Sequence, residues 1–414
     1  MQEVQVTEKH LADYRPIIGE AAHAEILGLA GRLRGKRIAH VNATAYGGGV
    51  AELLQSIVPL MRDLGLDARW FVLSGSSAFF EATKAMHNAL QGSKHDLTPD
   101  MVATYRAVNE TNAADFHDEF DVVVIHDPQP APLVTLTERR GVWIWRCHID
   151  LTTPNPSAIR LLAPYLPAYD AAIFSAKQYA PREIPIKRIA VSPPAIDPLS
   201  PKNRDVREEE RQAILGRFGF DVGRPIVSQV GRFDPWKDPL GVIDVYRAVK
   251  RKVRGVQLLL VASMASDDPE GWEWYERTAR HAGEDADIHL LTDLRGVRAL
   301  EVNVLQRETD VGMLKSIREG FGLTVSESLW KGVPVVGGDV GGIRIQIRDG
   351  KDGYVVGSKA QAAARTVELL RDEARRKRMG RTGRERVRTE FLITRYLRDY
   401  LRLFAEISQG GKAR

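Results

Sequence analysis

The stretch Ser192-Pro-Pro-Ala-Ile-Asp-Pro-Leu-Ser-Pro201 divides the chain into two halves of similar pattern. It is rich in proline, which fixes the backbone and interrupts both helices and sheets. On each side, short apolar runs alternate with longer segments of helical period, the pattern of a parallel sheet covered by helices on both faces. We therefore expect an α/β protein with two doubly wound domains and a stiff hinge at this stretch.

The expected strands are short apolar runs bounded by turn residues. In the first half they are Arg37–Asn42, Arg69–Leu73, Val122–His126, Val142–Cys147, Ala171–Phe174 and Arg188–Ser192. In the second half they are Ile226–Val230, Val256–Ala262, Ile288–Leu291, Val311–Leu314, Val333–Gly337 and Gly353–Val356. Apolar spacings of three and four predict an amphipathic helix from Val50 to Leu64, and a final helix is expected from about Ile393 to Ser408.

Length and composition limit the class of protein. A chain of 414 residues exceeds what one core usually supports, so we expect domains over residues 1–195 and 196–390, followed by a helical segment over 391–414. The net charge of 59 − 54 = +5 suits a small anionic substrate without requiring one. The single cysteine, Cys147, and the lack of a long apolar run or an apolar leader predict a cytoplasmic protein with no membrane association.

Two further classes of site are not expected. The histidines show no metal-ligand spacing and there is no cysteine pair, so no metal site is predicted. The arginines of the basic segment 375–388 are spread around a helix without interleaved aromatic residues. This is typical of a solvated helix face, and we expect no nucleic-acid partner.

In the second half, one carboxylate, Glu319, precedes a turn flanked by glycines, and another, Glu327, lies on the helix that follows. The first turn of a helix carries unpaired N–H groups and the positive end of the helix dipole, which can hold a diphosphate without a metal ion. The candidate donor-binding residues in this turn are Gly320, Phe321, Gly322, Leu323 and Thr324. The two acids then suit ligand hydroxyl groups, one on a sugar and the other on a ribose.

The strand ending at Val230 leads into a loop that carries Arg232 and Lys237. Both cations lie beyond a strand end, where ligands gather in open α/β sheets, and together they can reach one diphosphate. The alternative for such a pair is a solvated surface. Glu319 and Glu327 lie beyond strand ends of the same half, which favours the binding interpretation.

In the first half, Gly47, Gly48 and Gly49 follow the first main strand and lead into a helix. Three glycines at a helix start form either a phosphate or substrate cradle or a tight strand-to-helix turn. The pattern alone does not decide between these interpretations.

Polar residues also follow the third and fourth strands of this half. Asp127 and Gln129 stand between prolines and predict a corner that binds a polyol acceptor, with a simple Asp turn as the alternative. His148 and Asp150 are two residues apart and so lie on one side of an extended segment, which suits sugar hydroxyls. The alternative for His148 is a partly buried histidine with satisfied hydrogen bonds.

The Arg232 and Lys237 pair, followed by Glu319 and Glu327, resembles the signature of retaining glycosyltransferases with two Rossmann-like domains (GT-B), the family that includes sucrose and sucrose-phosphate synthases. The second domain of this family is also matched by Pro334-Val-Val-Gly-Gly338, Val340-Gly-Gly342, Ile347-Arg-Asp-Gly350 and Gly353-Tyr-Val-Val356. Other stretches are similar to the trehalose glycosyltransferring synthases within that family. They are His40-Val-Asn with Gly47-Gly-Gly49, Asn88-Ala-Leu-Gln-Gly92, His126-Asp-Pro-Gln-Pro130, Arg146-Cys-His-Ile-Asp-Leu151 and Arg232-Phe-Asp-Pro-Trp-Lys237.

The resemblance implies two domains facing across a cleft, an N-terminal one for the acceptor and a C-terminal one for the nucleotide sugar, with the last helix returning to the first domain. It implies transfer of glucose from ADP-, UDP- or GDP-glucose to glucose, giving α,α-trehalose reversibly and with retention. In the family, Arg232 and Lys237 would hold the diphosphate, Glu319 the sugar and Glu327 the ribose. His148 would lie by the reacting end of the donor sugar.

The sequence leaves other questions open. Lys315 stands where many family members have a small or uncharged residue, and it either adds a cation near the nucleotide or points outward. No tightly bound cofactor is expected, while a non-essential Mg²⁺ ion and a homodimer stay open. The rival functions are a sucrose-type synthase, a sugar-nucleotide epimerase and a non-catalytic sugar-nucleotide sensor.

Overall fold

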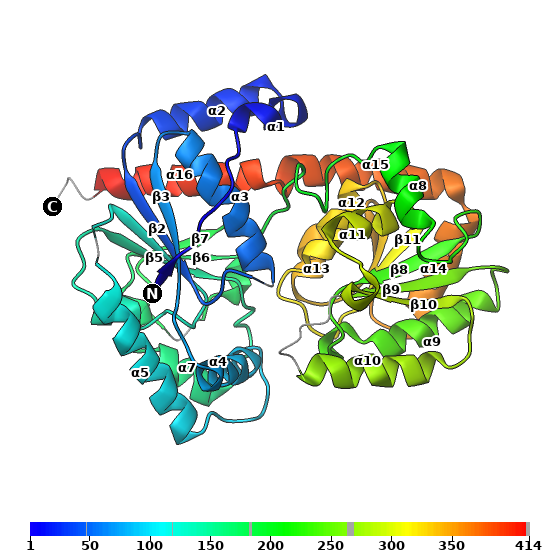
Figure 1. Cartoon of the computed structure of the whole chain (residues 1–414), viewed down its shortest axis with the longest axis horizontal. Coiled ribbons are helices and arrows are strands. Elements are labelled where there is room, and N and C mark those ends of the chain that lie inside the picture. Colours follow the sequence, from blue (N-terminus) through cyan, green and yellow to red (C-terminus); the bar gives the residue numbers. More distant parts are fainter. Residues whose placement is uncertain (47, 118, 182–183, 263–268, 411–414) are drawn as a thin grey trace. The chain divides into compact units, whose positions relative to one another are not determined.

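The computed structural model describes residues 1–46, 48–117, 119–181, 184–262 and 269–410. The chain forms two compact units (Figure 1). Unit N comprises Met1–Ala195 and Ile393–Arg414, and unit C comprises Ile196–Leu392. The junction between Ala195 and Ile196 lies inside the proline-rich stretch. The last helix, α16 (Ile393–Gly410), belongs to unit N, so the prediction that this helix returns to the first domain is confirmed.

The sheet of unit N has the strand order β1-β3-β2-β4-β5-β6-β7 in the described residues. Its strands are β1 (Gln2–Glu3), β2 (Arg37–Asn42), β3 (Asp67–Val72), β4 (Val122–His126), β5 (Val142–Cys147), β6 (Ala171–Phe174) and β7 (Ile189–Val191). Strands β2 to β7 pair in parallel, whereas β1 pairs antiparallel with β3. The sequence did not predict β1, because two polar residues carry no strand pattern.

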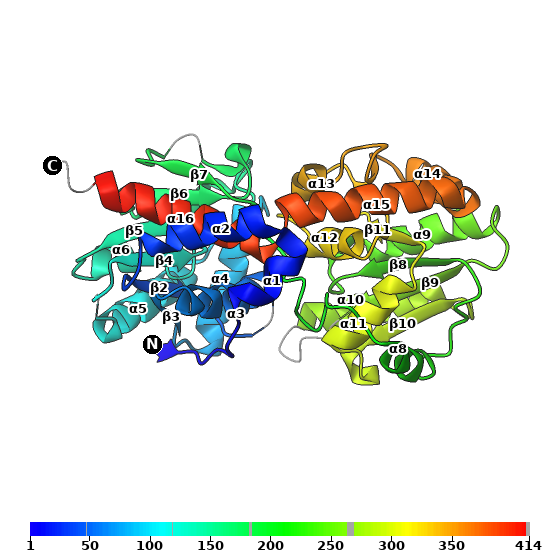
Figure 2. The same ribbon diagram turned by 90° about the horizontal axis from the view of Figure 1, so that it is seen from above.

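Helices cover both faces of this sheet. They are α1 (Leu11–Ile18), α2 (Glu20–Gly31), α3 (Gly49–Asp63), α4 (Ser77–Leu90), α5 (Pro99–Asp115), α6 (Leu133–Leu136), α7 (Pro156–Leu162) and α16, with short turns η1 (Leu166–Ala168) and η2 (Lys177–Tyr179). In α3, Leu54, Ile57 and Met61 of the predicted apolar face are fully buried, whereas Val50 and Leu64 at its ends are half-buried. Helix α16 packs against α2 and α3 (Figure 2).

The sheet of unit C is parallel throughout its described strands, in the order β10-β9-β8-β11-β12-β13. These strands are β8 (Ile226–Val230), β9 (Gln257–Ala262), β10 (Ile288–Thr292), β11 (Val311–Leu314), β12 (Val335–Gly338) and β13 (Gly353–Val356). Every residue of β9 and β11 is buried, as expected for parallel strands covered on both faces. The doubly wound architecture predicted for each half is therefore confirmed.

Two apolar cores lie on opposite faces of the unit C sheet. The helices that cover it are α8 (Glu208–Leu215), α9 (Pro239–Lys250), α10 (Pro269–Ala282), α11 (Ala299–Arg307), α12 (Leu323–Trp330), α13 (Gly341–Gln346), α14 (Lys359–Arg371) and α15 (Glu373–Glu390), with short turns η3 (Pro235–Lys237) and η4 (Asp293–Arg295). The larger core lies under α9 and α14, and the smaller one lies under α8 and α11.

Each sheet contains one point where the strand order reverses. In unit C the chain proceeds outward from β8 to β10 on one side and from β11 to β13 on the other, so the reversal lies between β8 and β11. In unit N it lies between β2 and β4. Open α/β sheets bind ligands outside the carboxyl ends of the strands at this switch point. The loops after these four strands are therefore the places to look for a site.

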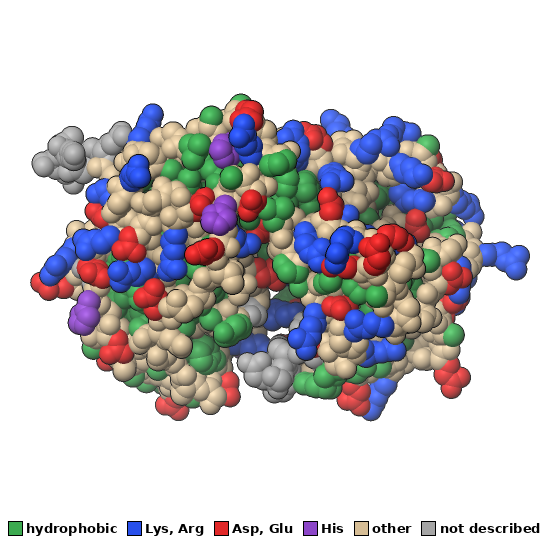
Figure 3. Space-filling view, turned by 45° about the horizontal axis from the view of Figure 1, so that its top comes forward, with side chains coloured by type: hydrophobic (Ala, Val, Ile, Leu, Met, Phe, Trp, Pro, Cys, Tyr) green, Lys and Arg blue, Asp and Glu red, His purple; other side chains and the backbone are tan. Residues whose placement is uncertain are grey.

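Basic and acidic side chains are interspersed on the face that Figure 3 presents. Within the described residues, no helix is long and apolar enough to cross a membrane.

Candidate active site

The loops after β8 and β11 are bound to each other at the switch point of unit C. The Lys237 ammonium forms an ion pair with the Glu319 carboxylate. The Ile317 amide donates to the Trp236 carbonyl oxygen at 2.7 Å, and Lys315 Nζ donates to Asp238 Oδ2 at 2.7 Å. Backbone and side-chain contacts together thus fix one loop against the other.

The Lys237 backbone and the Glu319 side chain are each held by further contacts. Asp234 caps η3 by accepting from the Lys237 amide at 2.9 Å, and Gln229 Nε2 donates to the Lys237 carbonyl oxygen at 2.7 Å. Ser316 Oγ donates to Glu319 Oε2 at 3.2 Å. Both ends of the ion pair are mostly buried, at 18% and 11% side-chain exposure, so the pair is shielded from bulk water.

Arg232 lies in the same loop but is much freer. Its guanidinium is 66% exposed and its Nη2 atom lies 3.6 Å from Asp234 Oδ2. Burial raises the pKa of Asp234, while Lys237 and Arg232 oppose that rise. The structure therefore places Arg232 on the loop that carries Lys237, and joint binding of a diphosphate stays a prediction.

The start of α12 has the backbone geometry of an anion site. Gly322 precedes the helix with a φ of 81°, and a Cβ atom there would lie 3.0 Å from Glu319 Cγ, so glycine suits both the conformation and the close approach. The Val325 amide bonds to the Gly322 carbonyl oxygen at 3.0 Å, whereas the Leu323 and Thr324 amides have no acceptor among the described residues. These two N–H groups are available to a ligand.

Phe321, another predicted donor residue, is buried and contacts Phe391 with 5.8 Å between ring centroids. The Phe321 carbonyl oxygen accepts a hydrogen bond from Gln346 Nε2 at 2.5 Å. The Phe321 side chain therefore anchors the turn and is not available to a ligand. The backbone groups of the turn, including those of Gly320, remain the candidates for binding one.

Glu327 lies on α12 with a side-chain exposure of 2%, and two residues that the sequence analysis did not select accompany it. Lys202 Nζ lies 3.5 Å from Glu327 Oε1, and Gln306 Nε2 donates to Oε2 at 3.5 Å. Contacts of this length are weak, so the carboxylate keeps capacity for further donors. No spacing in the sequence links Lys202 or Gln306 to Glu327.

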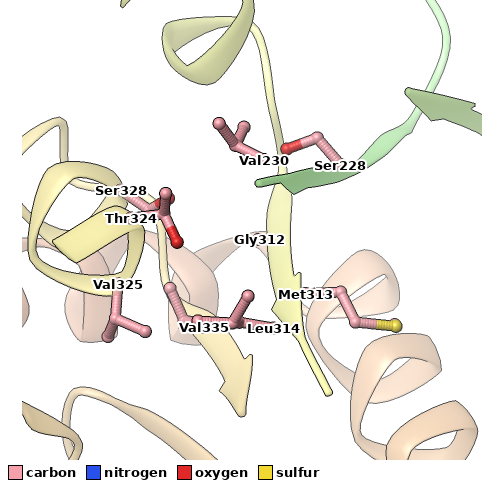
Figure 4. A pocket seen from close by; sticks show the side chains of 9 residues that line it. All are labelled: Ser228, Val230, Gly312, Met313, Leu314, Thr324, Val325, Ser328 and Val335. Atoms are coloured by element: carbon pink, nitrogen blue, oxygen red, sulfur yellow. The ribbon is translucent and has the colours of Figure 1, made fainter. Parts of the chain in front are cut away.

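A small pocket lies between α12 and strands β8, β11 and β12 (Figure 4). It is lined by Ser228, Val230, Gly312, Met313, Leu314, Thr324, Val325, Ser328 and Val335. Its polar groups include the Thr324 and Ser228 hydroxyls, and Ser228 Oγ accepts from Thr309 Oγ1 at 2.9 Å. The pocket places Thr324 at the boundary between the apolar interior and the start of the helix.

In unit N, three histidines lie along the carboxyl ends of β2, β4 and β5. His40 Nδ1 is 3.0 Å from His126 Nε2, and His126 Nδ1 is 3.2 Å from His148 Nε2. His40 and His126 are buried, while His148 is partly exposed. The sequence analysis selected only His148, although a histidine inside an otherwise apolar strand was a usable signal for the other two.

The Asp127 carboxylate holds the segment that carries His148. Its Oδ1 atom accepts from the His148 amide at 2.7 Å, and its carbonyl oxygen accepts from Trp145 Nε1 at 2.9 Å. Asp127 has a φ of 64°, and burial raises its pKa to about 6 despite the His148 amide and the nearby Arg146 guanidinium. Asp127 and His148, both predicted to be site residues, are thus brought together.

For the other predicted site residues of unit N, the described contacts do not include Asp127 or His148. In the described chain, Gln129 Oε1 is buried without a hydrogen-bond partner, which leaves an acceptor for a ligand hydroxyl. Asp150 accepts from the Thr152 amide at 2.9 Å and so forms a local turn. Gly48 has a φ of 89° and Gly49 begins α3, while Gly47 lies outside the described residues.

Comparison with known proteins agrees with this architecture. Residues 40–181 match the family model described as "Trehalose synthase, N-terminal domain", and residues 210–386 match "Glycosyl transferases group 1". Among solved structures, the chain resembles sucrose-phosphate synthase from Thermosynechococcus elongatus with a TM-score of 0.71 and 16% identity, covering 91% of this chain and 100% of that one. Together these findings define a glycosyltransferase with the two-domain GT-B fold.

Full-length relatives make the assignment narrower. The chain is 51% identical over 397 residues to a trehalose synthase from Thermococcus litoralis, covering 95% of this chain and 96% of the relative. It is 49% identical to a trehalose synthase from Rubrobacter xylanophilus, covering 98% and 99% respectively. The chain belongs to the trehalose synthase family.

Proposed function

We propose that the protein transfers glucose from an NDP-glucose donor to glucose and forms α,α-trehalose reversibly, with retention at the anomeric carbon. The observation that supports this most is the junction of the loops after β8 and β11, where Lys237 and Glu319 meet beside the free amides of α12. A cation, an acid and helix N–H groups at one switch point match the diphosphate and hydroxyl groups of a sugar nucleotide.

In this proposal Lys237 and Arg232 bind the diphosphate. A lysine ammonium has three N–H donors, so Lys237 can keep its bond to Glu319 and still donate to phosphate oxygens. Glu319 accepts from hydroxyl groups of the donor sugar, and Glu327 accepts from the ribose. Gly320 to Thr324 supply backbone donors to the phosphates.

Unit N supplies the acceptor residues. Asp127, Gln129 and Asp150 would accept hydrogen bonds from glucose hydroxyls, and His148 would contact the donor sugar at its reacting end. Gly48 and Gly49, at the start of α3, are further candidates for binding phosphate.

The reaction needs no protein nucleophile. The acceptor hydroxyl attacks on the face from which the diphosphate leaves, the new C–O bond forms as the old one breaks, and the leaving phosphate oxygen takes the hydroxyl proton. The cations and helix amides stabilise the charge that develops on the diphosphate.

A product assay tests the proposal. The protein is incubated separately with ADP-, UDP- and GDP-glucose plus glucose, and NMR identifies the disaccharide and its linkage. Parallel incubations with fructose and with glucose 6-phosphate distinguish a sucrose-type or phosphate-requiring enzyme, and incubation without acceptor detects an epimerase. We expect α,α-trehalose from glucose with at least one donor, whereas donor binding without any disaccharide would instead indicate a sensor.

A further inference from the structure

Burial keeps His40, His126 and His148 in their neutral forms, which couples the hydrogen bonds between these three rings. Burial lowers the pKa of His40 to about 3. Burial also holds the pKa values of His126 and His148 well below their usual range, and the Arg146 guanidinium contributes to both shifts. A neutral imidazole has one N–H donor and one acceptor nitrogen. His126 contacts His40 through one ring nitrogen and His148 through the other. It therefore donates a hydrogen bond to one of these rings and accepts one from the other.

Only two arrangements satisfy both contacts. In the first, all three rings carry their hydrogen on Nδ1, so His40 donates to His126 and His126 donates to His148. In the second, all three carry it on Nε2, so His148 donates to His126 and His126 donates to His40. The tautomer of His148, which is partly exposed, is therefore tied to that of His40, which is fully buried. The choice between the two arrangements is made at the His40 end.

At that end, His40 Nε2 is buried and has no hydrogen-bond partner among the described residues. The neighbouring Tyr400 ring lies 6.1 Å away between centroids, and its hydroxyl is already bonded to the Tyr396 hydroxyl at 2.8 Å. Buried N–H groups without a partner are rarer in proteins than acceptors without one. The unpaired Nε2 atom therefore carries the lone pair, and the hydrogen lies on Nδ1.

Among the other ionisable groups around these three rings, Arg146 favours the same neutral arrangement. Arg146 is a fully buried, permanent cation at the end of β5, and it disfavours an imidazolium beside it. The Asp127 carboxylate is bonded to the His148 amide. Tyr396 and Tyr400 face Arg146 and His40 from α16.

We propose that His40 and His126 are positioning residues that hold His148 in the tautomer with hydrogen on Nδ1. His148 then offers a hydrogen-bond donor, and not a base, to the ligand. That ligand is a sugar or phosphate oxygen, a step that rests on the proposed function. A fixed donor at this position accounts for a transfer in which the leaving phosphate oxygen takes the proton.

Nitrogen-15 NMR of the histidine-labelled protein tests the tautomers without any substrate, so it is independent of the product assay. Variants at each of the three positions assign the signals. We expect protonated Nδ1 and bare Nε2 on all three rings from about pH 6 to 8. Hydrogen on Nε2 of any of these rings, a mixture of tautomers, or an imidazolium would overturn the proposal.

Two substitutions separate positioning from a merely structural role. His126→Phe keeps a ring but breaks both hydrogen bonds, so we expect His148 to show averaged tautomer signals and kcat to fall about 10-fold or more, with little change in KM. His40→Asn keeps an amide near the place of Nδ1 and should preserve both the His148 signals and most of the activity. His23→Phe, on α2 of the same unit, is the matched control. An unchanged His148 spectrum in folded His126→Phe would contradict the proposal, and the wild-type spectrum decides the question if that variant does not fold.

Discussion

Units N and C both gather polar residues at a switch point, but the electrostatics of the two places differ. In unit C the loops after β8 and β11 hold charged side chains in pairs, Lys237 with Glu319 and Lys315 with Asp238. In unit N, neutral imidazoles are prominent at the corresponding strand ends, beside an acid with a raised pKa. Paired charges suit an anionic diphosphate, and neutral donors and acceptors suit sugar hydroxyls. The same architecture can therefore present two chemically different surfaces.

The largest effect on activity is expected from removing a cation of unit C. We expect Arg232→Ala to lower the rate of glucosyl transfer by roughly 10²-fold or more, because a charge partner of the departing diphosphate is lost. Initial rates of nucleoside diphosphate release measure the effect. Arg378→Ala removes an exposed arginine from α15 and serves as the control with unchanged rate. Near-normal turnover of Arg232→Ala would remove this residue from the site.

The raised pKa of Asp127 gives a pH-dependent prediction for unit N. Between the ordinary value of 3.8 and about 6, the folded state binds more protons than the unfolded state, so the wild type loses stability as pH rises through this range. Asp127→Asn keeps the acceptor for the His148 amide and tolerates the left-handed backbone. We expect the variant to gain about 2 kcal/mol over wild type at pH 8 and little at pH 4, a figure reduced from the full shift because the side chain partly reaches solvent.

Urea unfolding at pH 8, pH 4 and pH 3 measures these differences in the free energy of unfolding, and Asp121 offers a control of opposite sign. Although burial opposes it, hydrogen bonds from the Arg37 amide and Lys36 lower the pKa of Asp121. Its stabilising effect is present above its unfolded pKa and is lost as pH falls. Asp121→Asn should therefore be more destabilising at pH 8 than at pH 3. Equal pH dependence for the two variants would contradict the assignment of Asp127.

A substitution of Lys315 tests whether the ion pair between the two loops of unit C is needed for activity. Lys315→Met keeps the length of the side chain but removes the ion pair with Asp238, which is largely shielded from solvent. Because a looser loop misplaces Glu319 relative to Lys237, we expect kcat/KM to fall about 10-fold. Lys351→Met, at an exposed position, should have no effect. Equal rates for both variants would show that Lys315 does not position the loop.

The smallest effect is expected for a charge pair outside both switch points. Arg188 pairs with Glu406 of α16, and both side chains are more than 40% exposed. Exposed pairs contribute little, so Arg188→Ala should change the free energy of unfolding by about 0.5 kcal/mol and leave activity unchanged. Thermal unfolding and the product assay measure the two quantities. A loss of activity would mean that charges matter beyond the switch points.

The sequence predicted the strands and the family because their signals are local. Apolar runs such as Val122–His126 become buried parallel strands with little ambiguity, and the Glu319 to Glu327 spacing lies within one turn and helix. The polar partners were harder to predict, because they meet only through the topology. The His40 to His126 contact joins residues 86 positions apart, and Lys202 reaches Glu327 across a still longer gap in sequence. Nothing in the sequence links Lys315 to its partner Asp238, which lies 77 positions earlier.

A crystal structure of the protein with ADP-, UDP- or GDP-glucose bound tests the central claim most directly. We expect Arg232 and Lys237 to contact the diphosphate, Glu319 the hydroxyl groups of the glucose and Glu327 the ribose. A donor bound elsewhere, or bound with these four side chains turned away from it, would contradict the account.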